Sequence, residues 1–274
     1  MPSAAHPSQP PEPAPHAHDP HAHDPHAHAD RAGSFERDAD VYAQVRPTYP
    51  RDALAWLLPE GAQQVLDLAA GTGKLTEGAL GLLGGAADVV AVDPSAAMLA
   101  ELSARLPGVA THRGTAERIP LPDASVDAVL IGQAWHWFDA GAAAAEIARV
   151  LRPGGTVGIV WNDRDTEVDW VARFGEILHR GDRLAPDDGH PAPTDLGASF
   201  DAVEARTFRW ADRMPVASLR TLAGTRSYLL TLPEDERAAL LDEVDALAAT
   251  HPQLAGRTEV DLPYVTYAYR ARRR

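Results

Sequence analysis

The sequence contains no cysteine, and Lys74 is the only lysine among its 25 basic residues. Without cysteine, disulfide scaffolds, thiolate zinc sites and cysteine nucleophiles are all excluded. The sequence also lacks a run of about 18 apolar residues, which a membrane helix requires, and residues 1–30 hold no apolar signal-peptide core. We therefore expect a cytoplasmic protein with no membrane partner.

Positive charge is scarce, because the 274 residues carry a formal net charge of −14. A broad nucleic-acid surface needs a basic stripe, and the one basic run comprises the arginines at 270 and 272–274. The rest of the composition, 45% hydrophobic and 23% charged, is typical of a globular domain. We expect a small-molecule partner and no nucleic acid, while the sequence gives no indication of the oligomeric state.

Residues 1–33 differ from the rest of the chain, because they are rich in His, Pro, Ala and Asp and have no periodic apolar face. Such a segment cannot bury enough apolar surface to offset its ordering entropy, so we predict a disordered extension. Clustered histidines bind nickel, copper or zinc, but we interpret that affinity as incidental and predict no metal site. Residues 34–274 are predicted to form one domain.

From Phe35 onward, strand and helix patterns alternate, which indicates an α/β fold with a doubly wound parallel sheet. Strands are predicted at 64–69, 87–92, 109–113, 126–132 and 156–162, and helices at 74–83, 95–106 and 139–151. Asp139 is expected to cap its helix, which the sequence Arg152-Pro153-Gly154-Gly155 should end. Later elements are predicted as helices at 167–180, 216–230 and 234–250 and as strands at 203–210 and 259–270.

The stretch VLDLAAGTGKLT, residues 65–76, is predicted to form a strand, a glycine turn and a helix. A phosphate-binding P-loop is excluded, because it requires glycine at position 68 and Ser or Thr at position 75, where leucines stand. A dinucleotide fingerprint is disfavoured, because it requires a third glycine where Thr76 stands. In addition, Asp67 is a poor neighbour for a pyrophosphate at the helix N-terminus.

S-adenosylmethionine fits the pattern better, because it carries an amino-acid end in place of phosphates. Asp67 supplies negative charge for its ammonium group, directly or through water, and Gly71 and Gly73 let the backbone approach closely. Asp93, at the end of the next predicted strand, can accept hydrogen bonds from both ribose hydroxyls. One βαβ step separates the two carboxylates, which brings them to the same edge of the sheet.

These motifs resemble those of class I S-adenosylmethionine-dependent methyltransferases and, more narrowly, of the trans-aconitate methyltransferase-like small-molecule branch. VLDLAAGTGKLT is similar to the family's first motif, D-x-G-x-G-x-G, with Ala69 in place of the first glycine. VVAVDPSAAML resembles the ribose-binding step, GTAERIPLPDASVDAVLIGQAWHWFD the adenine-binding stretch, and LRPGG the turn before the fifth strand. The resemblance extends from about Phe35 to the last strand.

The resemblance implies a Rossmann-like seven-stranded sheet of order 3-2-1-4-5-7-6, with the last strand antiparallel and helices on both faces. It places the Ala116 backbone amide at the adenine, with Thr115 where relatives often have an acid. Residues 34–60 would form a lid that includes Tyr49, and 163–258 would set acceptor specificity. The implied cofactor-binding residues are Tyr42, Arg46, Asp67, Ala69, Gly71, Thr72, Gly73, Asp93, Pro94, Thr115, Ala116, Glu117, Gln133 and Ala134.

Methyl transfer from a sulfonium is an in-line displacement, so the protein mainly aligns the reactants and excludes water. His136 is the one candidate for a catalytic base, and the alternative interpretation is a structural or binding group between Trp135 and Trp137. Asp163 and Arg164 are candidates for the pocket rim. A carboxylate acceptor needs no base, and Arg46 would then orient it.

We therefore expect an enzyme that transfers a methyl group from S-adenosylmethionine to a small organic acceptor. Two alternatives stay open: a protein that binds S-adenosylmethionine without catalysis, and a methyltransferase that acts on a macromolecule.

Overall fold

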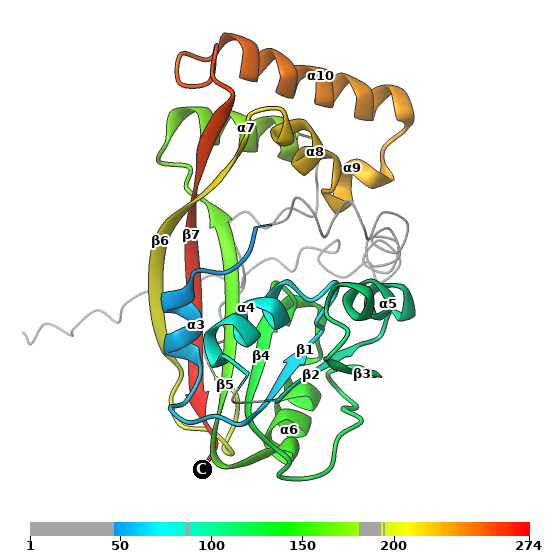
Figure 1. The fold of residues 1–274 in the computed structure, drawn as a ribbon, viewed down its shortest axis with the longest axis vertical. Helices are drawn as coiled ribbons and strands as arrows, with labels where there is room; N and C mark the ends of the chain where they lie inside the picture. Colours follow the sequence, from blue (N-terminus) through cyan, green and yellow to red (C-terminus); the bar gives the residue numbers. More distant parts are fainter. Residues whose placement is uncertain (1–46, 86–87, 181–192, 194) are drawn as a thin grey trace, which may run out of the picture.

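The computed structural model describes residues 47–85, 88–180, 193 and 195–274. Its centre is a seven-stranded sheet of order β3-β2-β1-β4-β5-β7-β6, as expected (Figure 1). Strand β7 runs antiparallel to both β5 and β6, and the pairs from β3 to β5 are parallel. The strands are β1 (Gln64–Leu68), β2 (Asp88–Asp93), β3 (Ala110–Arg113), β4 (Val126–Gly132), β5 (Leu151–Arg164), β6 (Glu204–Pro215) and β7 (Glu259–Arg272).

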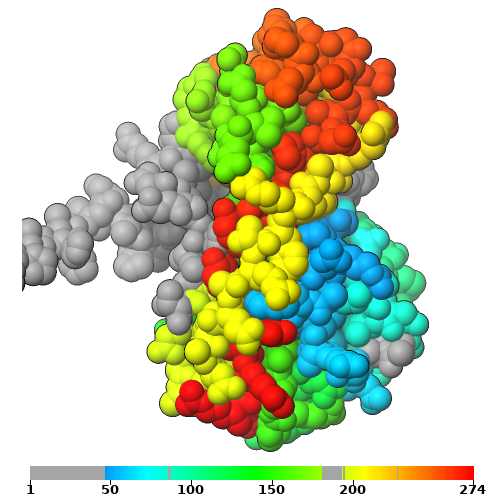
Figure 2. Space-filling model, turned by 90° about the vertical axis from the view of Figure 1, so that its left-hand side faces the viewer, coloured from blue at the N-terminus to red at the C-terminus, as the bar shows by residue number. Residues whose placement is uncertain are grey.

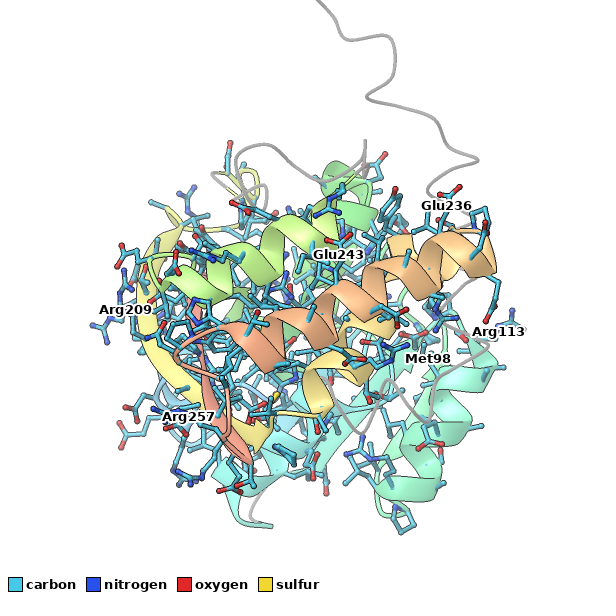
Figure 3. The ribbon with its side chains drawn as sticks, turned by 90° about the horizontal axis from the view of Figure 1, so that it is seen from above. Met98, Arg113, Arg209, Glu236, Glu243 and Arg257 are labelled. Atoms are coloured by element: carbon cyan, nitrogen blue, oxygen red, sulfur yellow. The ribbon has the colours of Figure 1, made fainter. Side chains whose placement is uncertain are left out.

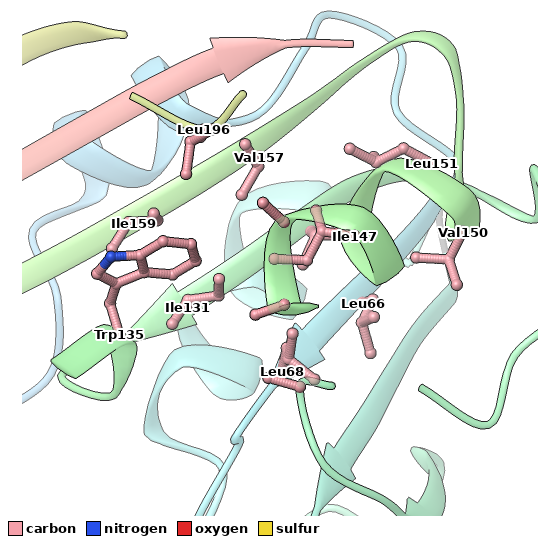
Figure 4. Packing of buried hydrophobic residues seen from close by; sticks show 14 of the residues in the cluster. Leu66, Leu68, Ile131, Trp135, Ile147, Val150, Leu151, Val157, Ile159 and Leu196 are labelled. Carbon is pink, nitrogen blue, oxygen red and sulfur yellow. The ribbon is translucent and has the colours of Figure 1, made fainter. Parts of the chain in front are cut away.

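Helices cover both faces of this sheet. The helices are α3 (Arg51–Leu57), α4 (Lys74–Leu83), α5 (Ala96–Arg105), α6 (Ala140–Val150), α7 (Asp169–His179), α8 (Ser218–Gly224), α9 (Ser227–Thr231) and α10 (Glu234–Thr250), with a 3₁₀ turn at Trp135–Trp137. Leu54 and Leu57 of α3 pack with Leu75 of α4 against one face. Ile147 of α6 packs on the other face, with Trp135 beside it (Figure 4). We call these the α4 face and the α6 face.

The expected helix ends are present. The side chain of Asp139 accepts a hydrogen bond from the Ala142 amide at 3.0 Å, and Ser95 caps α5 through the Met98 amide at 3.3 Å. Helix α6 ends at Val150, and Gly154 then adopts a φ of +80°, which disfavours side chains. Both helices therefore begin and end close to the positions that the sequence pattern predicts.

Strands β6 and β7 extend beyond the ends of the parallel strands and lead into a helical lobe, made of α7 to α10 (Figure 1). A second core fills this lobe, with Phe174, Leu219 and Leu262 fully buried. Figure 2 shows the lobe and the sheet region as two bulges on the molecular surface. Figure 3 views the lobe from above, where Glu243 of α10 accepts a 2.5 Å hydrogen bond from Arg180 beyond the end of α7.

Four features differ from the expectation or refine it. Strand β5 begins at Leu151, before the expected start at 156, so the sequence Arg152-Pro153-Gly154-Gly155 lies within the strand. Strand β6 reaches Pro215, well past the expected end at 210, because its pairing with β7 continues to Glu259. The stretch 216–230 forms two helices, because the chain leaves helical geometry at Thr225 and Arg226. Residues 51–57, placed in the lid by sequence, form α3 in the core.

Several expectations concern residues outside the described ranges. The extension 1–33 with its histidines and residues 34–46 of the lid lie there, and these include Tyr42 and Arg46. In the part of the chain that is described, no helix has the length and apolar character needed to cross a membrane. A cytoplasmic location stays a prediction.

Candidate active site

The glycine turn follows β1 and lies against the end of β2. Ala69, Gly71 and Gly73 have φ values of +59°, +54° and +85°, so the turn uses left-handed backbone at three positions. The Gly71 amide donates a 2.8 Å hydrogen bond to Oδ2 of Asp93. Oδ1 of Asp93 accepts a second bond, also 2.8 Å, from the Ser95 amide. Asp93 therefore fixes the position of the turn while its carboxylate lies at the strand end expected for ribose binding.

The two glycines of the turn serve different purposes. A Cβ atom on Gly73 would lie 2.8 Å from Cγ of Leu102 in α5, so Gly73 allows the helices to approach the turn. A Cβ atom on Gly71 would meet no atom of the described residues within 4 Å. Gly71 thus presents bare backbone to open space, which is the property that a closely bound ligand requires.

Asp67 is a buried carboxylate, and within the described part of the chain its side chain has a single hydrogen-bonding partner residue, Thr76. Its side chain is 1% exposed, and Oδ2 accepts a 2.5 Å hydrogen bond from the Thr76 hydroxyl of α4. Oδ1 is also buried and has no hydrogen-bond partner within the described residues. The pKa of Asp67 is raised to about 7, mainly by burial and to a smaller extent by the Asp93 charge, while the Thr76 hydrogen bonds act in the opposite direction.

This arrangement fits the amino-acid end of S-adenosylmethionine. An isolated buried carboxylate oxygen costs free energy unless a donor or a positive charge meets it. An ammonium group next to Oδ1 would provide both. The hydroxyl oxygen Oγ1 of Thr72, inside the turn, is a second buried oxygen without a hydrogen-bond partner among the described residues.

The predicted adenine-binding residues lie beyond β3 and β2. Ala116 is buried in the core on the α6 face, while Thr115 and Glu117 are exposed. The Glu117 carboxylate accepts a 3.1 Å hydrogen bond from the Asp139 amide, which connects this loop to the start of α6. The Pro94 carbonyl accepts a 2.9 Å hydrogen bond from Arg113. Their contacts with a cofactor stay a prediction.

The end of β4 leads into the 3₁₀ turn with its two tryptophans and His136. Gln133 has a φ of +58°, and its side-chain amide donates a 3.0 Å hydrogen bond to the Asn162 carbonyl of β5. Ala134 is buried. His136 is exposed and lies 4.7 Å from the Trp137 ring, which is itself 38% exposed. His136 is therefore accessible at this sheet edge, a condition that a catalytic base must meet.

A polar network that the sequence did not suggest joins the strand ends on the α4 face. The Trp210 indole donates a 2.8 Å hydrogen bond to the Thr266 hydroxyl, which donates to Oδ1 of Asn162 at 2.6 Å. The Asn162 amide donates to the Thr48 carbonyl at 2.7 Å. The network fixes the entry of the chain into α3 against three strands of the sheet.

Tyr49 lies next to this network. A Cβ atom added to Gly132 at the end of β4 would be 2.5 Å from the Tyr49 hydroxyl and 3.2 Å from Leu75. The Tyr49 hydroxyl thus lies between the end of β4 and the first turn of α4, next to the glycine turn. Of the three lid candidates, Tyr42, Arg46 and Tyr49, only Tyr49 is among the described residues, and it lies at this candidate site.

The two candidates for the pocket rim, Asp163 and Arg164, are the last residues of β5. The Arg164 guanidinium lies over the Phe174 ring at 5.3 Å, so it connects β5 to the helical lobe. Register places Arg164 opposite Tyr264 of β7, and Tyr264 opposite Trp210 of β6. These three side chains share the α4 face, because directly paired residues point to the same side of a sheet.

Comparisons with known proteins show which family the chain resembles. The model of the methyltransferase domain family matches residues 66–159. The chain is 46% identical over 244 residues to an uncharacterized methyltransferase of Mycobacterium tuberculosis, covering 88% of this chain and 96% of the relative. It is 34% identical over 242 residues to a methyltransferase-like protein of Schizosaccharomyces pombe, with 86% and 94% covered.

Among solved structures, one from Anaeromyxobacter dehalogenans, described as a type II methyltransferase, shares 28% identity with a TM-score of 0.60. That match covers 83% of this chain and 97% of the other. The narrower resemblance to the trans-aconitate branch stays a prediction. The sheet order, the glycine turn between two carboxylates and the near full-length similarity lead to one conclusion: the chain belongs to the class I S-adenosylmethionine-dependent methyltransferases.

Proposed function

We propose that the protein binds S-adenosylmethionine at the glycine turn and transfers its methyl group to a small organic acceptor. The observation that carries the proposal is the buried Oδ1 of Asp67, which lacks a partner among the described residues and lies in the strand before Gly71. Asp67 would bind the ammonium group, Gly71 would approach the ligand with bare backbone, and Asp93 would accept hydrogen bonds from the ribose. Both Asp93 oxygens accept backbone hydrogen bonds, and a carboxylate oxygen can accept more than one.

When bound, S-adenosylmethionine supplies an activated methyl group, whose carbon–sulfur bond breaks as the acceptor's lone pair forms the new bond. The protein's own contribution is to hold the acceptor in line and to keep water away. Tyr49, Trp137 and Trp210 are the aromatic side chains suited to that purpose at this edge of the sheet. The strongly negative net charge supports a small organic acceptor over a nucleic acid.

His136 is the proposed base for an acceptor that must lose a proton, such as a hydroxyl or an amine. A carboxylate acceptor is already ionised near neutral pH and needs no base. The two cases predict different behaviour of His136→Gln. With a carboxylate acceptor, the variant keeps kcat and its pH profile; with a protic acceptor, kcat falls by about 10²–10⁴-fold.

Calorimetry with two ligands tests cofactor binding. S-adenosylhomocysteine carries the ammonium group, and 5′-methylthioadenosine lacks the amino-acid end. We expect Asp67→Asn to weaken binding of S-adenosylhomocysteine by roughly 10- to 100-fold, as expected for loss of a charged hydrogen bond, and to leave 5′-methylthioadenosine unaffected. Asp93→Asn should weaken both, because both ligands carry the ribose.

Equal losses for both ligands in Asp67→Asn would contradict the ammonium assignment. A screen of small acceptors for S-adenosylhomocysteine release then separates an enzyme from a protein that only binds. Binding without turnover across carboxylates, amines and hydroxyl compounds would support the binding-only alternative.

A further inference from the structure

Lys74, the chain's only lysine, stands in an unfavourable position that the fold does not explain. It is the first residue of α4, directly after Gly73, and a cation at a helix N-terminus is opposed by the helix dipole. Its side chain is half-buried, and burial lowers the pKa of the ammonium group, with the Arg105 charge as the next cause. Among the described residues, no hydrogen bond or direct ion pair holds this ammonium group in place.

The charges of Arg105, Glu77 and Asp212 affect the pKa of Lys74, and the first two already form an ion pair with each other. Arg105 donates a 2.8 Å hydrogen bond to Glu77 and another, also 2.8 Å, to the Thr72 carbonyl. Arg105 and Glu77 therefore largely neutralise each other. The remaining charge is Asp212 of β6, whose carboxylate attracts the Lys74 ammonium group without contacting it.

Asp212 lies on the arm that leads from the sheet to the helical lobe. It pairs with Leu262, two residues beyond the pair of Trp210 and Tyr264, whose rings stack at 5.2 Å. Since side chains two residues apart share a face, Asp212 points to the same α4 face as Trp210. Its carboxyl is half-buried, and burial raises the pKa of Asp212, while the Lys74 charge opposes that effect.

On the basis of the proposed function, we propose that Lys74 and Asp212 determine acceptor specificity: Lys74 binds an anionic group of the acceptor, and Asp212 binds a hydroxyl or amine group. Lys74 comes directly after the cofactor turn, and Asp212 comes from the arm of the helical lobe. Both charged groups are half-buried, and among the described residues no ion pair joins them. The stacked rings of Trp210 and Tyr264 supply an apolar surface next to Asp212.

The single lysine makes a direct test possible. Reductive methylation with ¹³C-formaldehyde keeps the positive charge and gives Lys74 one NMR resonance, besides that of the terminal amine. We expect Asp212→Asn to lower the titration midpoint of this resonance, because it removes an attractive negative charge. Glu77 and Arg105, the other charges that act on Lys74, stay unchanged in this variant.

Asp261→Asn is the matched control. Asp261 lies one residue before Leu262 on β7, is exposed, and pairs in register with Arg213, on the face away from Asp212. Its loss should leave the Lys74 resonance unchanged. Equal effects of the two variants, or no effect of Asp212→Asn, would contradict the proposed interaction between Asp212 and Lys74.

Ligand selection is tested on the same resonance in protein saturated with S-adenosylhomocysteine. The probes are succinate, glycerol 3-phosphate and the neutral succinamide, so that carboxylate and phosphate sources of an anion are distinguished. We expect at least one anion to shift the Lys74 resonance and succinamide to leave it unshifted. In Lys74→Met, calorimetric affinity for that anion should fall by roughly 10- to 100-fold, with affinity for S-adenosylhomocysteine retained.

Shifts that are equal for succinamide and the anions, or absent for both anions, would overturn the inference. A protein that binds no S-adenosylhomocysteine would instead contradict the proposed function, so the two failures are distinguishable.

Discussion

Asp67→Asn should stabilise the ligand-free protein at alkaline pH, although it removes a residue of the proposed active site. The change keeps the acceptor oxygen for the Thr76 hydroxyl and eliminates the buried charge. A rise in the carboxyl pKa from 3.8 to about 7 means that ionising Asp67 in the folded state costs about 4 kcal/mol more than in the unfolded chain. An unpaired amide N–H at the former Oδ1 position costs about 1–3 kcal/mol. The net gain in unfolding free energy at pH 8 is therefore about 2 kcal/mol.

The sign of the pH dependence follows from linkage. Between pH 3.8 and about 7, the folded protein holds a proton on Asp67 that the unfolded chain has lost. The free energy of unfolding therefore decreases as the pH rises through this range, and the cost of Asp67 is complete above about pH 7. Asn does not titrate, so the stability advantage of the variant should shrink as the pH falls. The advantage should disappear near pH 5, where the cost of the Asp67 charge has fallen to about 2 kcal/mol and equals the cost of the unpaired amide N–H.

Urea unfolding at pH 8 and pH 5 measures the effect. Asp88→Asn is the control, because Asp88 is an exposed carboxylate on the neighbouring strand β2 and should change stability by less than about 0.5 kcal/mol. A variant that is no more stable than the parent at pH 8, or whose advantage is the same at both pH values, would refute the assignment of Asp67 as a buried charge maintained for a ligand.

Three further changes have defined outcomes. Gly71→Ala should weaken binding of S-adenosylhomocysteine at least tenfold in calorimetry while costing only about 1 kcal/mol of stability, because the new methyl group enters the open space at a φ of +54°. Ala69→Gly should raise the unfolding free energy by about 0.5–1 kcal/mol in urea titrations, since glycine relieves the left-handed strain at φ +59°; a loss of stability would contradict this. Asn162→Leu should cost about 2–3 kcal/mol, because it leaves the Thr48 carbonyl and the Thr266 hydroxyl without their partner, and a neutral effect in the same titrations would show that the network carries little energy.

The sequence was sufficient to predict the βα units and the strand order implied by the resemblance. Their signals are local or repeat along the chain: alternating apolar strands, Asp139 as a helix cap, and Gly154 after α6. Asp67 and Asp93 could be placed at one edge because parallel strands end there. The structure added that the Asp93 carboxylate also accepts hydrogen bonds from the Gly71 and Ser95 amides, so it positions the turn as well.

The rest of the site could not be predicted from sequence for physical reasons. Asn162 contacts Thr48 and Thr266, which lie 114 and 104 positions away, and no periodic pattern marks such a contact. Lys74 is visible as an unusual residue, but its counterpart Asp212 lies beyond the expected end of a strand. The extra length of β6 depends on pairing with β7, which local propensity does not encode.

The most direct test of the account is a crystal structure of the protein with S-adenosylhomocysteine bound. The account predicts the ligand's ammonium group within hydrogen-bonding distance of Oδ1 of Asp67, or joined to it through one water, and the ribose hydroxyls on the Asp93 carboxylate. A ligand bound with its amino-acid end away from Asp67, with Oδ1 still buried and without a partner, would contradict it.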